Sequence, residues 1–139
     1  MNYLLDTNVL CEPTKPKPNG RVMEWLAVTD EDRLYLSAVT LAEVQRGVSR
    51  MPSGVRRERI RHWLEHDVFE RFGDRILSVD SAVGLQWGKI MAEAEVKGKA
   101  MSSLDGFIAA TAVVRDLTLA TRNVADFKDA VPQVVNPWE

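Results

Sequence analysis

The stretch Tyr3-Leu4-Leu5-Asp6-Thr7-Asn8 begins with three apolar residues and turns polar at Asp6. A short apolar run that stops at an acid is typical of a buried strand ending at the polar edge of a sheet. Further along the chain, four more apolar runs are strand candidates, at residues 34–37, 75–79, 118–120 and 133–135. The opening stretch therefore predicts the first strand of a buried sheet.

Helical patterns separate these strands. Apolar residues at helical spacing predict a helix after the Pro- and Gly-containing loop 12–20, another that begins at Thr40, and three more over 60–68, 81–97 and 103–115. Strands alternating with helices indicate βαβ units. We expect an α/β fold in which residues 1–139 form a single three-layer α/β/α domain around a mostly parallel sheet of four to five strands.

Composition narrows the classes of protein and of binding site. With 139 residues, 45% of them hydrophobic and 27% charged, the chain matches an ordinary globular domain. The net charge of -2 excludes binding of nucleic acid by overall electrostatic attraction, so such a partner needs a local basic surface or a bound cation. Cys11 is the single cysteine, which excludes an internal disulfide and a multi-thiolate zinc site.

The sequence carries no pattern that predicts export or membrane insertion. The amino terminus has no basic region and meets Asp6 too early for a signal peptide. The longest strongly apolar stretch, 107–114, is far below the roughly 20 residues that a membrane-spanning helix needs. We expect a cytoplasmic protein that does not associate with membranes.

Four acids are predicted to meet at one edge of the sheet. Ligands of open parallel sheets bind at the carboxyl ends of the strands, and Asp6 directly follows the first strand. Asp126 follows the strand 118–120, together with Thr121 and Asn123. Glu43 and Asp105 fall in the predicted first turns of helices that follow strands. The topology should therefore bring together Asp6, Glu43, Asp105 and Asp126.

Each of these acids also has a purely structural interpretation. Thr40-Leu41-Ala42-Glu43 matches a capping box, and Ser102-Ser103-Leu104-Asp105 places an acid where it complements a helix dipole. Asp126 is predicted in a loop and could be a turn residue. Asp6 could cap the segment that follows the first strand.

If the acids do meet, they need a counter-charge, because neighbouring carboxylates raise each other's pKa. A site of oxygen ligands alone favours Mg²⁺, with Mn²⁺ as the alternative. A hard cation that activates water and stabilises negative oxygen atoms is suited to phosphodiester hydrolysis. The residues thus predict a magnesium-dependent hydrolase.

Five segments also carry recognisable motifs. They are Leu5-Asp6-Thr7-Asn8-Val9, Ser37-Ala38-Val39-Thr40-Leu41-Ala42-Glu43, Ser103-Leu104-Asp105-Gly106-Phe107-Ile108-Ala109-Ala110-Thr111-Ala112, Leu119-Ala120-Thr121-Arg122-Asn123-Val124-Ala125-Asp126-Phe127 and Val135-Asn136-Pro137-Trp138. In this order they resemble PIN domains, most closely the VapC toxins of the FitB-like branch. The resemblance spans nearly the whole chain.

This resemblance implies a set of site residues. The family's metal-binding acids correspond to Asp6, Glu43 and Asp105, with Thr121 ordering the site. Some relatives carry the fourth acid where this chain has Asn123, and others where it has Asp126. We assign Asp126 as the fourth catalytic and metal-binding acid. Whether the site binds one or two metal ions stays open. The supporting residues are then Asn8, Thr121 and Asn123.

The resemblance also implies partners. It implies a homodimer, a VapB-like antitoxin that blocks the site, a larger assembly with that antitoxin on operator DNA, and cleavage of RNA that arrests translation, with transfer RNA a frequent target. Independently, arginines concentrate between Arg46 and Arg61, which could contact phosphate. A solvated helix face or an antitoxin contact is the alternative. The candidate RNA contacts are Arg46, Arg50 and Arg122.

Three other functions are compatible with parts of the sequence. His62-Trp63-Leu64-Glu65-His66 spells the H-x-x-E-H signature of some zinc proteases. A magnesium-dependent phosphatase could use Asp6 as its nucleophile, although no clear glycine loop for phosphate is present. A catalytically silent module could bind only its antitoxin and regulate its operon, although all the candidate acids are retained.

Overall fold

A single five-stranded sheet organises the computed structural model, which describes residues 1–139. All strand pairs are parallel, and the order is β3-β2-β1-β4-β5. The strands are β1 (Tyr3–Leu5), β2 (Leu34–Ser37), β3 (Ile76–Leu77), β4 (Thr118–Ala120) and β5 (Val134–Val135). The α/β prediction is confirmed. The third strand is shorter than the predicted 75–79, because only Ile76 and Leu77 pair with β2.

Helices connect the strands in the predicted alternation. They are α1 (Thr7–Cys11), α2 (Gly20–Val28), α3 (Ala38–Arg50), α4 (Val55–His62), α5 (Phe69–Phe72), α6 (Ser81–Val96), α7 (Ser103–Val114) and α8 (Val124–Phe127). A π-helical segment, Trp63–Val68, joins α4 to α5. None of these helices has both the length and the apolarity that crossing a bilayer requires.

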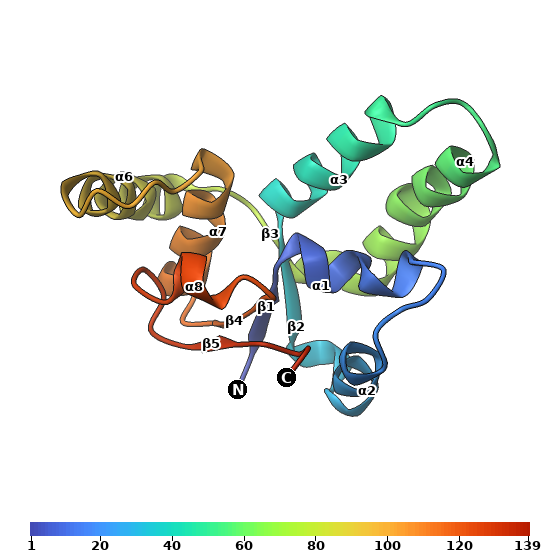
Figure 1. Ribbon diagram of the computed structural model, residues 1–139, viewed down its shortest axis with the longest axis horizontal. Helices are drawn as coiled ribbons and strands as arrows, with labels where there is room; N and C mark the ends of the chain where they lie inside the picture. The colour runs from blue at the N-terminus through green and yellow to red at the C-terminus, as the bar shows by residue number, and fades with distance from the viewer.

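Two hydrophobic clusters cover the two faces of the sheet. Leu4 belongs to the cluster that includes Phe127 of α8, whereas its neighbour Leu5 belongs to the cluster that includes Phe72 of α5. Successive side chains of a strand point to opposite faces, so both residues are buried. Figure 1 shows α6, α7 and α8 on one side of β1 and β2, with α1, α2 and α4 on the other. These are the three layers expected.

The start of α3 differs from the prediction. The helix begins at Ala38, and Ser37 rather than Thr40 is its N-cap, because the Ser37 hydroxyl accepts a 3.0 Å hydrogen bond from the backbone N–H of Val39. The capping-box interpretation of Thr40 and Glu43 is therefore wrong. Glu43 lies in the second turn of α3, and its carboxylate is not used in capping this helix.

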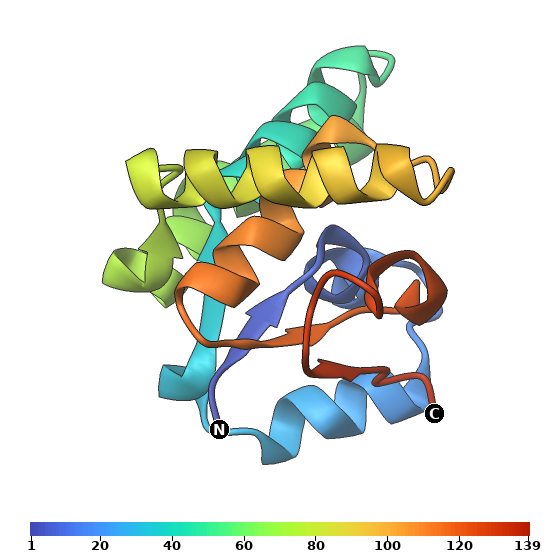
Figure 2. The ribbon, with the colours of Figure 1, turned by 90° about the vertical axis from the view of Figure 1, so that its left-hand side faces the viewer.

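Helices α6 and α7 pack closely, which fixes the start of α7. A Cβ atom on Gly106 would lie 2.6 Å from the Sδ atom of Met91 and 2.9 Å from Nε1 of Trp87, so any other residue would force these side chains to shift. The indole N–H of Trp87 donates a 3.1 Å hydrogen bond to the carbonyl of Ser103, and its ring stacks on Phe107 with centroids 4.9 Å apart. Figure 2 shows α6 lying across α7 on the outside of the molecule.

Candidate active site

Asp6 lies at the carboxyl end of β1 and is only 5% exposed. One carboxylate oxygen, Oδ1, accepts a 2.8 Å hydrogen bond from the Thr7 N–H, so Asp6 is the N-cap of α1. The other oxygen, Oδ2, accepts a 2.7 Å hydrogen bond from the Thr121 hydroxyl. The capping interpretation is therefore confirmed, and the carboxylate also stands at the sheet edge that the sequence predicted.

Thr121 links Asp6 to the segment after β4. Its hydroxyl donates to Asp6 and accepts a 3.0 Å hydrogen bond from the Asn123 N–H. Asn8, in the first turn of α1, accepts a 3.4 Å hydrogen bond through Oδ1 from the Arg122 N–H. Both strand ends predicted to meet do meet, and Thr121 orients the Asp6 carboxylate.

Glu43 reaches the same edge from α3. Its Oε1 atom accepts a 3.0 Å hydrogen bond from the hydroxyl of Thr7, the residue after Asp6, although 36 positions separate the two in sequence. Thr7 is a supporting residue that the sequence did not single out. The one available signal was its position in the Asp-Thr-Asn turn, where a hydroxyl in the first helical turn can face a neighbouring element.

Asp105 is the third residue of α7, whose N-cap is Ser102. The backbone N–H of Asp105 donates a 3.1 Å hydrogen bond to the Ser102 hydroxyl, and Asp105 lies in the first turn of α7, where the sequence predicted that its charge complements the helix dipole. Its carboxylate is half-buried and forms no ion pair. Capping uses the backbone N–H of Asp105, whereas metal binding would use its carboxylate. The two roles are therefore compatible at this position.

Asp126 is helical rather than in a loop. It lies in α8, and its N–H donates a 3.0 Å hydrogen bond to the carbonyl of Asn123. The turn interpretation is wrong because the chain winds into this short helix directly after Asn123. Asp126 is exposed, but its charge still helps to raise the pKa of both Asp6 and Asp105.

The four acids influence one another electrostatically. Burial is the main cause that raises the pKa of Asp6, Glu43 and Asp105 above their ordinary values. Further increases come from Asp6 acting on Glu43 and Asp105, and from Asp105 acting on Glu43. None of the four forms a salt bridge. The edge therefore carries concentrated negative charge without a basic partner.

The carboxylates lie at the same sheet edge, but their oxygen atoms do not converge on one position. No three histidine, cysteine, aspartate or glutamate side chains lie in an arrangement that could hold a metal ion as they stand. Glu43 and Asp105 are only half-buried, so a change of rotamer could bring their oxygens closer. The donor set is oxygen only and lacks a counter-charge, which fits Mg²⁺ or Mn²⁺.

Comparisons with known proteins identify the fold family. The sequence model of the PIN domain matches residues 3–131. The chain belongs to the PIN-domain family. This PIN domain has all of the motif-bearing acids within the matched range, as the resemblance implied.

Close relatives narrow the group within that family. The PIN domain is 41% identical to Toxin FitB of Neisseria gonorrhoeae over 135 residues, 97% of each chain. It is 38% identical to VapC ribonuclease Y4jK of Sinorhizobium fredii over 136 residues, 98% of this chain and 97% of the relative. The solved structure of FitAB bound to an IR36 DNA fragment matches with a TM-score of 0.92 and 39% identity, covering 99% of this chain and 96% of that one. The predicted resemblance to VapC and FitB-like toxins is confirmed.

The candidate RNA-binding arginines of this PIN domain have different surroundings. Arg46 and Arg50 are exposed on α3, the helix that carries Glu43. The guanidinium of Arg122 lies over the ring of Trp138, 5.4 Å from its centroid. Arg122 is therefore held against the carboxyl-terminal segment, whereas Arg46 and Arg50 are free to meet another molecule.

Two competing sites lack the geometry they need. The rings of His62 and His66 are exposed with centroids 4.5 Å apart, but no third side chain joins them in a group able to hold a metal. A zinc-protease centre needs three protein ligands. Asp6 is also a poor phosphatase nucleophile, because it is buried and both of its oxygens accept hydrogen bonds.

Proposed function

We propose that residues 1–139 form a single PIN domain that acts as the toxin of a VapBC-type toxin–antitoxin pair. In this proposal the protein is a magnesium-dependent endoribonuclease that hydrolyses phosphodiester bonds, with transfer RNA or another translation-related RNA as substrate. The observation that carries the proposal is the group of four acids at one sheet edge, buried or half-buried in three cases and without a basic partner. The similarity to VapC ribonuclease Y4jK supports the reaction class.

The residues of the chain have distinct roles in this reaction. Asp6, Glu43, Asp105 and Asp126 would hold Mg²⁺, which Mn²⁺ could replace. When bound, the ion supplies positive charge to the developing negative oxygens and favours deprotonation of water. The Thr121 hydroxyl holds Asp6 in position.

The remaining groups assist those acids. The Thr7 hydroxyl holds Glu43, and Asn8 connects the start of α1 to the segment after β4. The Asn123 N–H donates to the Thr121 hydroxyl and so helps to hold it in place. These hydrogen bonds limit the rotamers of the acids, so less order has to be gained when the ion and the substrate bind.

The partners follow from the same proposal. The similarity to FitAB bound to DNA supports an antitoxin partner for this toxin and an assembly with that antitoxin on operator DNA. We further propose a homodimer, a cytoplasmic location where RNA and antitoxin meet, and RNA contacts from Arg46, Arg50 and Arg122.

Cleavage of total transfer RNA by the purified protein tests this proposal. Wild-type protein should cut RNA with Mg²⁺ present and stop when a chelator is added. Asp6→Asn and Asp105→Asn should each lower the rate at least about 1000-fold, since several kcal/mol of transition-state stabilisation depend on the ion.

Asp74→Asn is the matched control, because Asp74 is exposed and makes no side-chain hydrogen bond or salt bridge. It should cut RNA like the wild type. Circular dichroism confirms that each variant is folded. Equal rates for wild type, Asp6→Asn and Asp105→Asn would overturn the ribonuclease proposal.

A further inference from the structure

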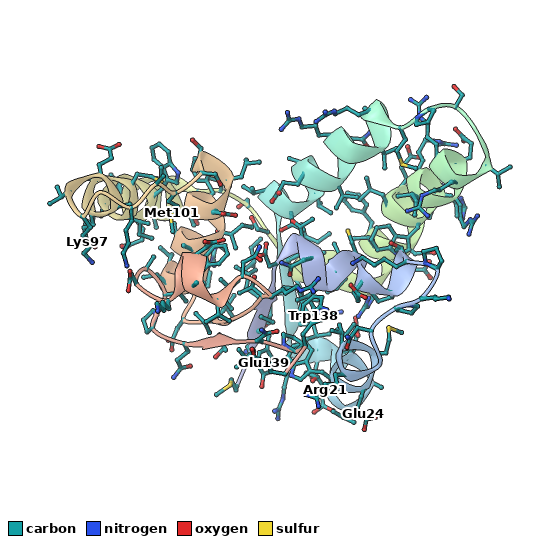
Figure 3. All side chains as sticks on the ribbon, viewed as in Figure 1. Arg21, Glu24, Lys97, Met101, Trp138 and Glu139 are labelled. Carbon is teal, nitrogen blue, oxygen red and sulfur yellow. The ribbon has the colours of Figure 1, made fainter.

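A pocket of about 280 Å³ opens beside the candidate active site. It lies between the carboxyl-terminal end of α6, the segment 98–102 that leads to α7, and helix α8. Figure 3 labels two of its residues, Lys97 and Met101, at the α6 end of the molecule. The pocket is lined by Ile90, Glu93, Ala94, Lys97, Lys99, Ala100, Met101, Ala125, Asp126, Asp129 and Ala130.

The pocket shares Asp126 with the acid group. A continuous set of hydrogen bonds fixes this proximity. The Asp126 N–H donates to the Asn123 carbonyl, the Asn123 N–H donates to the Thr121 hydroxyl, and that hydroxyl donates to Asp6. A group held in the pocket would therefore lie next to the carboxylates proposed to bind the metal.

The lining combines an apolar interior with a polar rim. Six of its eleven residues are hydrophobic, and the half-buried thioether of Met101 offers a soft, polarisable surface to a flat ring. Lys99 is paired with Asp129 across the rim. The rim carries three acids and two bases, namely Glu93, Asp126, Asp129, Lys97 and Lys99, so it does not favour a phosphate group.

Size and chemistry together favour a nucleobase. Small-molecule pockets usually span about 300–1,000 Å³, so this one suits a single ring system and not a larger ligand. A base has two apolar faces and an edge of donors and acceptors, which matches apolar walls below a rim of charged side chains. Unpaired bases of RNA are commonly bound in this way by proteins.

We propose that this pocket takes one unpaired nucleobase of the RNA strand, next to the phosphodiester bond that is cut. The proposal rests on the ribonuclease function and assigns its substrate a single-stranded segment at the cut. Helix α7 lies between α6 and α3 (Figure 1). A strand that reaches from Arg46 and Arg50 on α3 to the pocket would pass the start of α7, where Asp105 lies.

Pocket filling combined with base-free RNA tests the proposal. Ala94→Leu with Ala100→Leu narrows the pocket, and Ala92→Leu is the matched control, because Ala92 is exposed on the same helix and does not line the pocket. The unfilled protein, the filled double variant and the control all carry Asp6→Asn as well, so that they bind RNA without cutting it. Fluorescence anisotropy with Mg²⁺ present measures their affinity for oligomers of uridine, cytidine or adenosine and for a base-free ribose-phosphate strand of equal length.

The expected result is a change in one ratio. Filling the pocket should reduce the preference for base-bearing over base-free strands by about tenfold, the usual effect of losing one stacked base. Affinity for the base-free strand should not change, and the control should keep the full preference. An unchanged preference, or an equal loss for both kinds of strand, would overturn the base pocket.

Two further outcomes separate this proposal from others. If the filled pocket leaves RNA binding intact and weakens binding of the co-expressed antitoxin, its occupant is a protein segment and the nucleobase proposal is wrong. If wild-type protein cuts no RNA but the preference still depends on the pocket, the ribonuclease function fails while base binding stands.

Discussion

Two groups of acids in this PIN domain have opposite electrostatic surroundings. Outside the four-acid group, three acids have pKa values below the ordinary range, and each has a basic partner: Glu12 with Lys15, Glu58 with Arg61 and Asp129 with Lys99. At the carboxyl edge, Asp6, Glu43 and Asp105 have raised pKa values and no such partner. The first three acids are compensated by a base, whereas the buried and half-buried acids at the sheet edge are left uncompensated.

This contrast explains why the edge is a functional candidate. Concentrated charge in a half-buried position destabilises the folded chain, so it is retained where something other than stability depends on it. A divalent cation would neutralise this charge, whereas a lysine or arginine would block access to the metal.

The largest effect on stability should come from the compensated group. Glu12 is 3% exposed, and its Oε2 atom accepts a 2.8 Å hydrogen bond from the Asn19 N–H. Glu12→Ala removes that acceptor, so urea unfolding should show a loss of about 2 kcal/mol. Glu12→Gln keeps an acceptor and should lose less. An alanine variant as stable as the wild type would show that this ion pair does not hold the loop after α1.

The same residue has a defined pH dependence. Because folding lowers the pKa of Glu12 below its usual 4.5, its contribution is fully present above pH 4.5. The contribution is lost as the pH falls through the lowered pKa. The difference in unfolding free energy between wild type and Glu12→Gln should therefore shrink in acid.

The uncompensated group should behave in the opposite way. Folding raises the pKa of Asp105 above its usual 3.8, so the folded state binds more protons than the unfolded state between 3.8 and the raised value. Stability therefore falls as the pH rises through that window. In magnesium-free buffer at neutral pH, Asp105→Asn should be more stable than wild type by less than about 1 kcal/mol, since solvent screens the half-buried group.

Urea unfolding across pH checks this prediction. The advantage of Asp105→Asn should disappear as the pH falls below 3.8, where the wild-type carboxyl is neutral in both states. An advantage that grows in acid would mean that Asp105 is stabilised as an anion and belongs with the compensated acids.

The smallest effect should come from an exposed pair. Arg61 contacts Glu58 at 2.6 Å and Glu65 at 2.8 Å, but all three side chains are largely in solvent. Pairs of this kind contribute little to stability because water and salt screen them. Arg61→Ala should leave the urea midpoint unchanged, and a clear loss would show that α4 depends on this pair.

Much of the sheet edge could be predicted because its signals are local. Tyr3-Leu4-Leu5 has no polar residue to place in solvent, so it had to be buried on both faces, and Asp6 had to follow it at the edge. In β4, Leu119 and Ala120 are buried in the same way, and Thr121 follows them at the edge. Parallel topology then brings these two strand ends together without further information.

The start of α3 could not be read in the same way. Ser37 and Thr40 are both good caps, and the choice depends on where β2 ends, which its pairing with β3 determines. With the helix beginning at Ala38, Val44 and Val48 fall on its buried side. Local propensity alone does not distinguish these two starts.

Contacts between distant segments were also beyond the sequence. The hydrogen bond from Thr7 to Glu43 depends on the crossing of α1 and α3, and the pocket lined by Met101 and Asp126 depends on how α6 and α8 approach each other. Neither has a spacing signal in the chain. The identity of the acids was predictable, whereas their supports and neighbours required the fold.

Direct titration with divalent cation tests most closely whether the uncompensated acids share one ion. Calorimetry with Mn²⁺, in competition with Mg²⁺, should detect binding to wild type and to the Asp74→Asn control, and at least about a tenfold weaker affinity for Asp6→Asn and Asp105→Asn. Equal affinity for all four proteins, or no binding by wild type, would contradict the account.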